Sequence, residues 1–126
     1  MTFRTPLGRV HGLGSAREGT RHWWTQRLTA VALVPLSLWF IWSLAGMNLA
    51  DHAEVTAWMR SPVTATLLIL FIYPLFHHAE LGIQVVIEDY VEPEALKIGS
   101  IIAVKFVLWA AGLAAVLAVL KIFLGM

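Results

Sequence analysis

The chain has 126 residues, of which 59% are hydrophobic and only 13% are charged. Soluble domains usually carry about 25% charged residues, so this composition indicates a single integral membrane domain, and we expect no nucleic acid as a partner. The absence of cysteine excludes disulfides, thiolate metal sites and iron–sulfur ligation on this chain.

The first expected unit is an N-terminal arm over residues 1–26. Glycine recurs there among arginines, and no apolar run of signal-peptide length occurs. The arm ends near Trp23 and Trp24, whose amphipathic rings are typical of the headgroup level of a bilayer. We therefore expect an irregular or surface-lying basic arm, followed by a membrane domain over residues 27–126.

Three apolar segments long enough to cross a membrane follow the arm. Residues 28–50 carry no charge, and a helix of that length extends about 34 Å, which exceeds a hydrocarbon core of ~30 Å. The second segment must continue through His77 and beyond, because residues 61–76 are too few to span. Lys105 alone interrupts the third segment. The sequence therefore predicts an all-α membrane protein with spans at about 27–50, 61–88 and 97–122.

The links between the spans are polar. Residues 51–61 are expected to hold a turn of interfacial helix, with its apolar side chains on one face. Residues 88–97 contain four carboxylates, which places that link at the water boundary.

Basic residues flank the spans unevenly. Five of the nine precede the first apolar run, whereas Arg60 alone lies in the first link. Basic loops favour the cytoplasmic side, so we expect a cytoplasmic N-terminus and a periplasmic C-terminus in a bacterial inner membrane, or the matrix side for the N-terminus in a mitochondrion. Four polar residues then gather toward one face of the membrane: Arg27, His78, Asp89 and Tyr90.

The stretch over residues 77–90 crowds imidazoles, carboxylates and a phenol into an otherwise apolar chain. On a helix, Gly82 falls roughly 40° and Asp89 about 20° from His78 around the axis. A neutral imidazole suits haem iron, and a glycine one turn away leaves room for a flat macrocycle. The alternatives for His78 are a hydrogen bond across a helix interface, a metal site and a proton relay.

The neighbours of His78 point elsewhere. His77 lies about 100° from it around the helix and Glu80 about 200°, so the two histidines cannot hold one metal ion from a regular helix. Glu80 needs a partner of its own or a proton. A second polar stripe, formed by His77, Gln84 and Glu88, has no evident role.

Asp89 and Tyr90 end the second span, and Arg27 opens the first. A phenol beside a carboxylate suits a quinone, whose carbonyl oxygens need hydrogen bonds and, on reduction, protons. The alternative is an interfacial tyrosine anchor beside a solvated acid. Arg27 suits a lipid phosphate or a haem propionate, so the residues alone leave both alternatives open.

Two motifs carry a resemblance to a known family. The first is H-x3-G-x6-D-Y-V, from His78 to Val91, and the second is HWWTQRLTAVAL, from His22 to Leu33. In these motifs the chain resembles the hydrophobic membrane-anchor subunit of succinate dehydrogenase, respiratory complex II, in an alphaproteobacterial form. The likeness covers roughly residues 20–95, and the three spans extend it to nearly the whole chain.

The resemblance implies that the three spans form half of a six-helix anchor bundle. The other half would come from a second membrane-anchor protein of the complex, here called the companion anchor, and the two would share one haem b. His78 would be an axial ligand of the haem iron, Gly82 would pack on the haem, and Arg27 would lie near the propionates and the quinone. Asp89 and Tyr90 would contribute to the ubiquinone site.

The same resemblance implies the remaining partners. The FAD and iron–sulfur clusters would belong to the flavoprotein and iron–sulfur subunits, which dock on the cytoplasmic face. Phospholipid would surround the bundle.

Two other functions are compatible with the membrane composition. A cofactor-free structural anchor leaves the stripe of His78 and Gly82 unexplained, and a small proton- or ion-conducting protein has few spans for a pathway. On the strength of the resemblance, we expect a non-catalytic membrane subunit of succinate:ubiquinone oxidoreductase. The second polar stripe is then expected to pack against the companion anchor.

Overall fold

The computed structural model describes residues 16–126, where four α-helices and no strand occur. The three long helices are apolar enough to cross a membrane, as predicted, so the chain is an all-helical multi-pass membrane protein. In chain order the helices are α2 (Ala16–Ala45), α3 (His52–Arg60), α4 (Pro62–Tyr90) and α5 (Glu94–Leu124).

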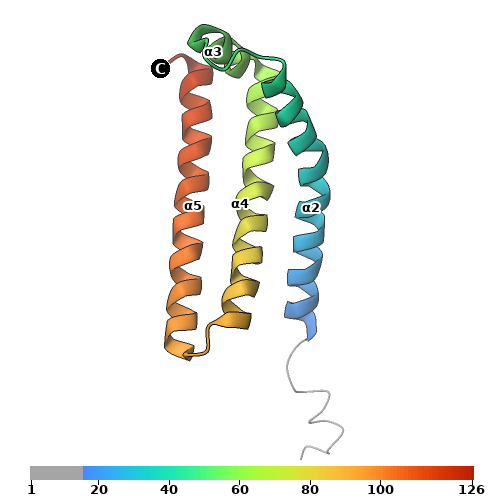
Figure 1. The fold of residues 1–126 in the computed structure, drawn as a ribbon, viewed down its shortest axis with the longest axis vertical. Helices are drawn as coiled ribbons and strands as arrows, with labels where there is room; N and C mark the ends of the chain where they lie inside the picture. The colour runs from blue at the N-terminus through green and yellow to red at the C-terminus, as the bar shows by residue number, and fades with distance from the viewer. Residues whose placement is uncertain (1–15) are drawn as a thin grey trace, which may run out of the picture.

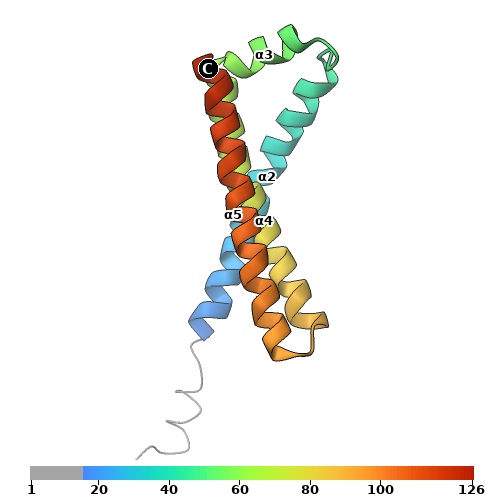
Figure 2. The same ribbon diagram turned by 90° about the vertical axis from the view of Figure 1, so that its left-hand side faces the viewer.

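The middle helix of the three is α4 (Figure 1). Both α2 and α5 pack against α4, whereas within the described part of the chain α2 and α5 do not contact each other. Figure 2 shows that α2 crosses the other two long helices obliquely, so that both of its ends diverge from them. The short helix α3 contacts α4 and α5. It bridges the gap between the diverging C-terminal end of α2 and these two helices.

The start of α2, the end of α4 and the start of α5 lie at the same end of the bundle, and α3 lies with the C-terminus at the opposite end (Figure 1). This is the up-and-down topology that the sequence predicts. It places Arg27 toward the same end as Asp89 and Tyr90, because these residues lie in the corresponding parts of α2 and α4.

The helix boundaries differ from the predicted ones at two places. α2 already includes residues 16–26, which were expected in an irregular arm, since this stretch has no proline and its arginine, glutamate and glutamine residues favour helix. The link between α4 and α5 shrinks to residues 91–93, because Glu94 suits the first turn of a helix. Residues 1–15 of the expected arm lie outside the described residues, and the division at residue 26 stays a prediction.

The short helix expected in the first link is confirmed as α3. The Asp51 carboxylate caps it by accepting hydrogen bonds from the backbone N–H groups of Ala53 and Glu54, at 2.9 and 3.3 Å. Trp58 stacks on Trp39 of α2, with ring centroids 5.9 Å apart. The aromatic contact therefore ties α3 to the upper half of α2.

The interior of the chain is small. Among residues 16–126 the buried apolar cluster has four members, and each remains 5–9% exposed. Large apolar side chains on the outer helices are open, such as Trp42 at 83% and Phe106 at 74%. The four cluster members are Ala65, Leu68, Ile72 and Val119.

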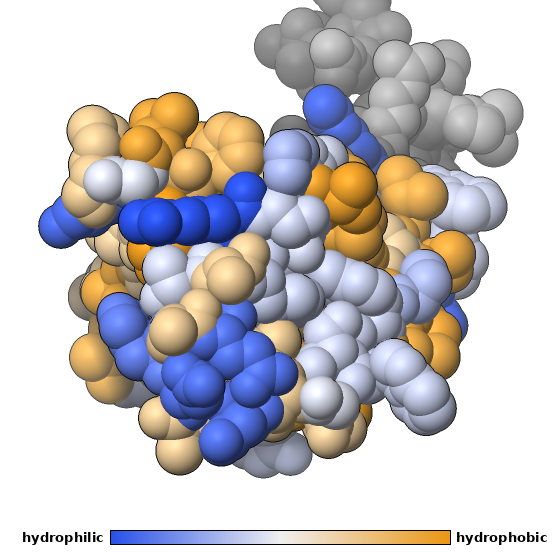
Figure 3. All heavy atoms as spheres, turned by 90° about the horizontal axis from the view of Figure 1, so that it is seen from above, coloured by the Kyte–Doolittle hydropathy of each residue, from blue (hydrophilic) through white to orange (hydrophobic). Residues whose placement is uncertain are grey.

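The polar and apolar surfaces are separated. Figure 3, which looks onto the α3 end, shows hydrophilic and intermediate residues over that end and hydrophobic residues at the sides. Lipid or another membrane chain must cover these sides, because apolar surface of this extent is unfavourable in water.

Candidate functional site

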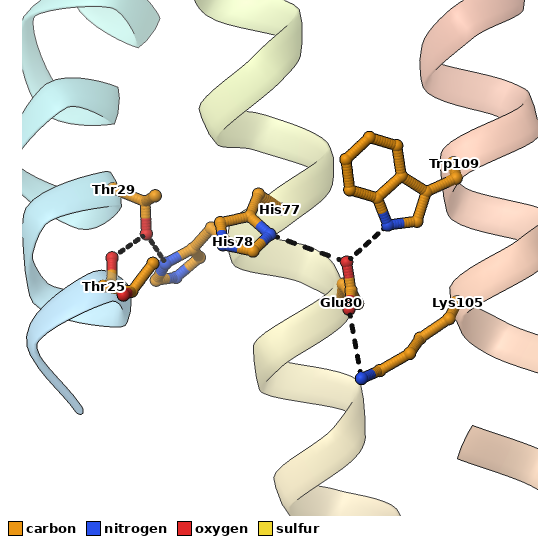
Figure 4. Close-up of polar contacts among 7 residues, drawn as sticks. All are labelled: Thr25, Thr29, His77, His78, Glu80, Lys105 and Trp109. Atoms are coloured by element: carbon orange, nitrogen blue, oxygen red, sulfur yellow. Dashed lines mark hydrogen bonds and ion pairs between the residues drawn. The ribbon is translucent and has the colours of Figure 1, made fainter. Parts of the chain in front are cut away.

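His78 lies on α4, and its imidazole points toward α2 (Figure 4). Its Nδ1 atom is 3.2 Å from Oγ1 of Thr29, a buried residue that is 7% exposed. The Thr29 hydroxyl also donates toward the backbone carbonyl oxygens of Thr25 and Gln26, each at 2.9 Å. The imidazole is therefore held between two helices by a side chain that is itself fixed to its own helix.

These contacts set the tautomer of His78. A hydroxyl has one proton and two lone pairs, and the proton of Thr29 is directed at the carbonyls of the preceding turn. The Nδ1–H of His78 therefore donates to Thr29 Oγ1, and Nε2 keeps its lone pair. This is the tautomer that binds a metal through Nε2.

Gly82 lies one turn beyond His78 on the same stripe of α4. A Cβ atom added there would meet no atom within 4 Å beyond its chain neighbours and the backbone of its own helix, as is also true at Gly19 and Gly99, so no packing among the described residues accounts for the glycine. At Gly112, by contrast, such an atom would lie only 3.3 Å from Cγ of Phe76. The open position beside His78 leaves space for a flat group, and these residues thus fit a haem whose iron is bound by His78.

Glu80 is buried on another face of α4, at 6% exposure. Its Oε2 accepts a hydrogen bond from Nε1 of Trp109 at 3.1 Å, and its Oε1 lies 3.7 Å from Nζ of Lys105. Nδ1 of His77 lies 3.5 Å from the same Oε2 (Figure 4). The partner that this carboxylate was expected to need is therefore a set of groups that joins α4 to α5.

The two adjacent histidines face different helices, as their spacing predicts. His77 turns to α5, and its ring stacks on Tyr73 with centroids 5.9 Å apart, beside a groove of about 200 Å³ between α4 and α5. The expected packing of this stripe against the companion anchor stays a prediction. Gln84 Nε2 donates to Glu88 Oε1 at 2.7 Å along α4. No group of three or more metal-ligating side chains occurs among the described residues.

A Lys105→Met change is expected to lower the Tm of the purified protein complex. It leaves the Glu80 carboxylate buried without its lysine, and one charge left alone in a protein interior is strongly destabilising. Adding Glu80→Gln removes that charge but keeps an oxygen for Trp109, so the double variant should regain part of the loss. The interaction free energy between two contacting residues in a double-mutant cycle is typically roughly 0.5–3 kcal/mol.

The matched control for this pair is Lys97→Met, on the same helix but outside the contacts of Glu80. Thermal unfolding followed by circular dichroism gives the Tm of each variant. The Glu80→Gln single variant completes the set. If the Tm of the double variant falls below that of the wild type by the sum of the Lys105→Met and Glu80→Gln effects, the pair is not coupled.

Asp89 and Tyr90 are the last two residues of α4. Tyr90 is 82% exposed, and Asp89 is also exposed. Arg27 is exposed on α2, where its guanidinium carbon lies 5.3 Å from the centroid of the Trp23 ring, a cation–π contact. The helix ends that carry these residues diverge in Figure 2, and in the described part of the chain no ion pair joins Arg27 to Asp89. A ligand at this end would therefore be completed by groups outside the chain.

Sequence reasoning missed two of the groups that hold the site. Thr29 lies within the motif from His22 to Leu33, but the motif does not say which residue it contacts, and Trp109 lies within an apolar span. The order of the spans could have pointed to Thr29, because His78 lies on a span that runs antiparallel to the one that carries Thr29. A threonine in an apolar segment is then a candidate partner for the histidine.

Comparisons with known proteins agree with one another. Residues 1–112 match the family model described as succinate dehydrogenase/fumarate reductase transmembrane subunit. The succinate dehydrogenase hydrophobic membrane anchor subunit of Rickettsia bellii is 38% identical over 105 residues, which cover 82% of each chain. The protein of the same name from Paracoccus denitrificans is 34% identical over 125 residues, covering 99% of this chain and 96% of that protein. The succinate dehydrogenase membrane anchor subunit of Reclinomonas americana is 30% identical over 95 residues, or 72% and 78% of the two chains.

Proposed function

The chain belongs to the family of succinate dehydrogenase/fumarate reductase transmembrane subunits, and we propose that it is the membrane anchor of a succinate:ubiquinone oxidoreductase. It binds part of a haem b, contributes to the ubiquinone-reduction site and holds the soluble subunits at the membrane, without catalysis of its own. One observation carries this proposal. Inside a membrane span, Nδ1 of His78 lies 3.2 Å from the hydroxyl oxygen of Thr29, whose own proton is directed at backbone carbonyl oxygens, and this arrangement leaves Nε2 for a ligand.

In this proposal His78 would hold the haem iron through Nε2, and the companion anchor would supply the second ligand. The bound haem supplies one-electron redox chemistry. The residues of this chain bind the iron, orient the imidazole and keep its proton at Nδ1, while Gly82 leaves space for the macrocycle. Arg27 is placed to attract a propionate or the quinone region by its charge.

The end of α4 has the chemistry that a quinone requires. The hydroxyl of Tyr90 donates a hydrogen bond to a quinone carbonyl oxygen, and the carboxylate of Asp89 lies next in the chain. The exposure of Tyr90, at 82%, supports a role at a surface completed by other chains. FAD and the iron–sulfur clusters belong to the flavoprotein and iron–sulfur subunits.

The exposed apolar sides of α2 and α5 support a membrane partner. We propose that the companion anchor covers one side to complete a six-helix bundle and that phospholipid covers the rest. The N-terminal basic residues support a cytoplasmic N-terminus and a periplasmic C-terminus in a bacterial inner membrane. The soluble subunits then dock at the end that holds Arg27 and Tyr90.

Deletion of this chain tests its anchoring role. In cells without it, succinate oxidation by an artificial dye should move from the membrane fraction to the soluble fraction, because the soluble subunits lose their attachment. Expression of the chain should return the activity to the membrane. Dye-linked activity that stays on membranes lacking the chain contradicts the anchoring role.

A further inference from the structure

We propose that Thr29 is the positioning residue of His78, and that its hydroxyl oxygen sets the tautomer and the ring orientation of the haem ligand. The inference rests on the proposed function, because it takes His78 as the ligand. Thr29 lies on a different helix, α2, and its contact with His78 cannot be read from the sequence motifs.

The acceptor is rigid before any ligand binds. Thr29 is 7% exposed, and its hydroxyl is bonded to the carbonyl oxygens of Thr25 and Gln26, both at 2.9 Å. A β-branched side chain has few rotamers on a helix, and the two hydrogen bonds to backbone carbonyl oxygens select one of them. The hydroxyl oxygen that faces His78 is thus fixed in position (Figure 4).

The consequence for His78 is chemical as well as geometric. A hydrogen bond accepted from Nδ1–H makes the imidazole a more basic ligand at Nε2. A more basic axial ligand favours the oxidised iron, and hydrogen bonds to the axial ligands help to set a haem potential. The neutral hydroxyl of Thr29 exerts a milder effect than a carboxylate would, because it carries no charge.

The test compares three variants in the purified, intact complex. Thr29→Val keeps the shape of the side chain but removes the acceptor, whereas Thr29→Ser keeps the hydroxyl. Thr25→Val is the matched control, because Thr25 lies one turn earlier and its hydroxyl bonds only the backbone carbonyl of Arg21, at 2.8 Å. The readouts are the midpoint potential of the haem and its rate of transfer to excess apomyoglobin.

Thr29→Val is expected to lose haem about 10- to 100-fold faster, which is the usual effect of removing such a partner. Its midpoint potential should shift to a more positive value. Thr29→Ser and Thr25→Val should remain close to the wild type in both measurements. If Thr29→Val does not assemble, Thr29→Ala removes the same hydroxyl from a smaller side chain and should shift both quantities in the same direction.

Two results would overturn the inference. One is a Thr29→Val complex, or the alanine variant in its place, with unchanged potential and unchanged haem release. The other is an equal shift in Thr29→Ser, because packing rather than the hydroxyl would then be the cause. Both results leave the proposed function standing if His78→Ala still abolishes the haem signal. A His78→Ala complex that keeps its haem refutes the ligand assignment instead.

Discussion

A Tyr90→Phe complex is expected to lose most of its ubiquinone reduction while it oxidises succinate with an artificial dye at the wild-type rate. The change removes only the phenolic hydroxyl, at a side chain that no packing within this chain constrains. A hydrogen bond to a group that becomes charged contributes ~1.5–3 kcal/mol, so we expect a fall of roughly 10- to 100-fold in quinone reductase activity. The dye accepts electrons before the quinone site and bypasses it.

Tyr73→Phe is the matched control, because Tyr73 is the other tyrosine of the chain. It lies in the middle part of α4, where its ring stacks on His77 and 63% of its surface is exposed. Loss of its hydroxyl should leave both assays unchanged. Equal losses in the quinone and dye assays of Tyr90→Phe would refute a role specific to the quinone.

The three spans could be predicted because the bilayer imposes their length. A segment without charge over residues 28–50 has few alternatives to a membrane helix. The helix ends were less predictable, because polar residues both cap helices and interrupt them. Glu94 was assigned to a link for its charge, yet it lies in the first turn of α5, where an acidic side chain is favourable.

The faces of α4 could also be predicted, because helical periodicity alone fixes them. His78 and Glu80 were expected on different faces, and they do face α2 and α5 respectively. The partners of each residue could not be predicted in the same way. Thr29 meets His78 only because α2 crosses α4 at that level, and no periodicity along one segment specifies such a crossing.

The residues at the helix ends depend on other chains. Arg27, Asp89 and Tyr90 are all exposed, and among the side-chain contacts of the described residues only the cation–π contact of Arg27 with Trp23 involves any of them, so their roles stay predictions. Glu80 shows the contrast. Its contacts with Trp109 and Lys105 lie within the chain, so this structure alone identifies its role in joining two helices.

A His78→Ala complex is expected to lose its b-type haem signal. An alanine cannot ligate iron, and an imidazole from the companion anchor alone would leave the haem with one protein ligand. His77→Ala is the matched control, because it removes an adjacent imidazole that faces Glu80 and not α2. Its haem should keep the wild-type spectrum, provided that α4 and α5 remain packed.

The most direct measurement is therefore the reduced-minus-oxidised absorption spectrum of the complex, purified through a tag on this chain, for the wild type and both variants. We predict a b-type signal in the wild type and in His77→Ala, and its loss in an assembled His78→Ala complex. A b-type signal of unchanged position and amplitude in the assembled His78→Ala complex would contradict the assignment of His78 as the haem ligand.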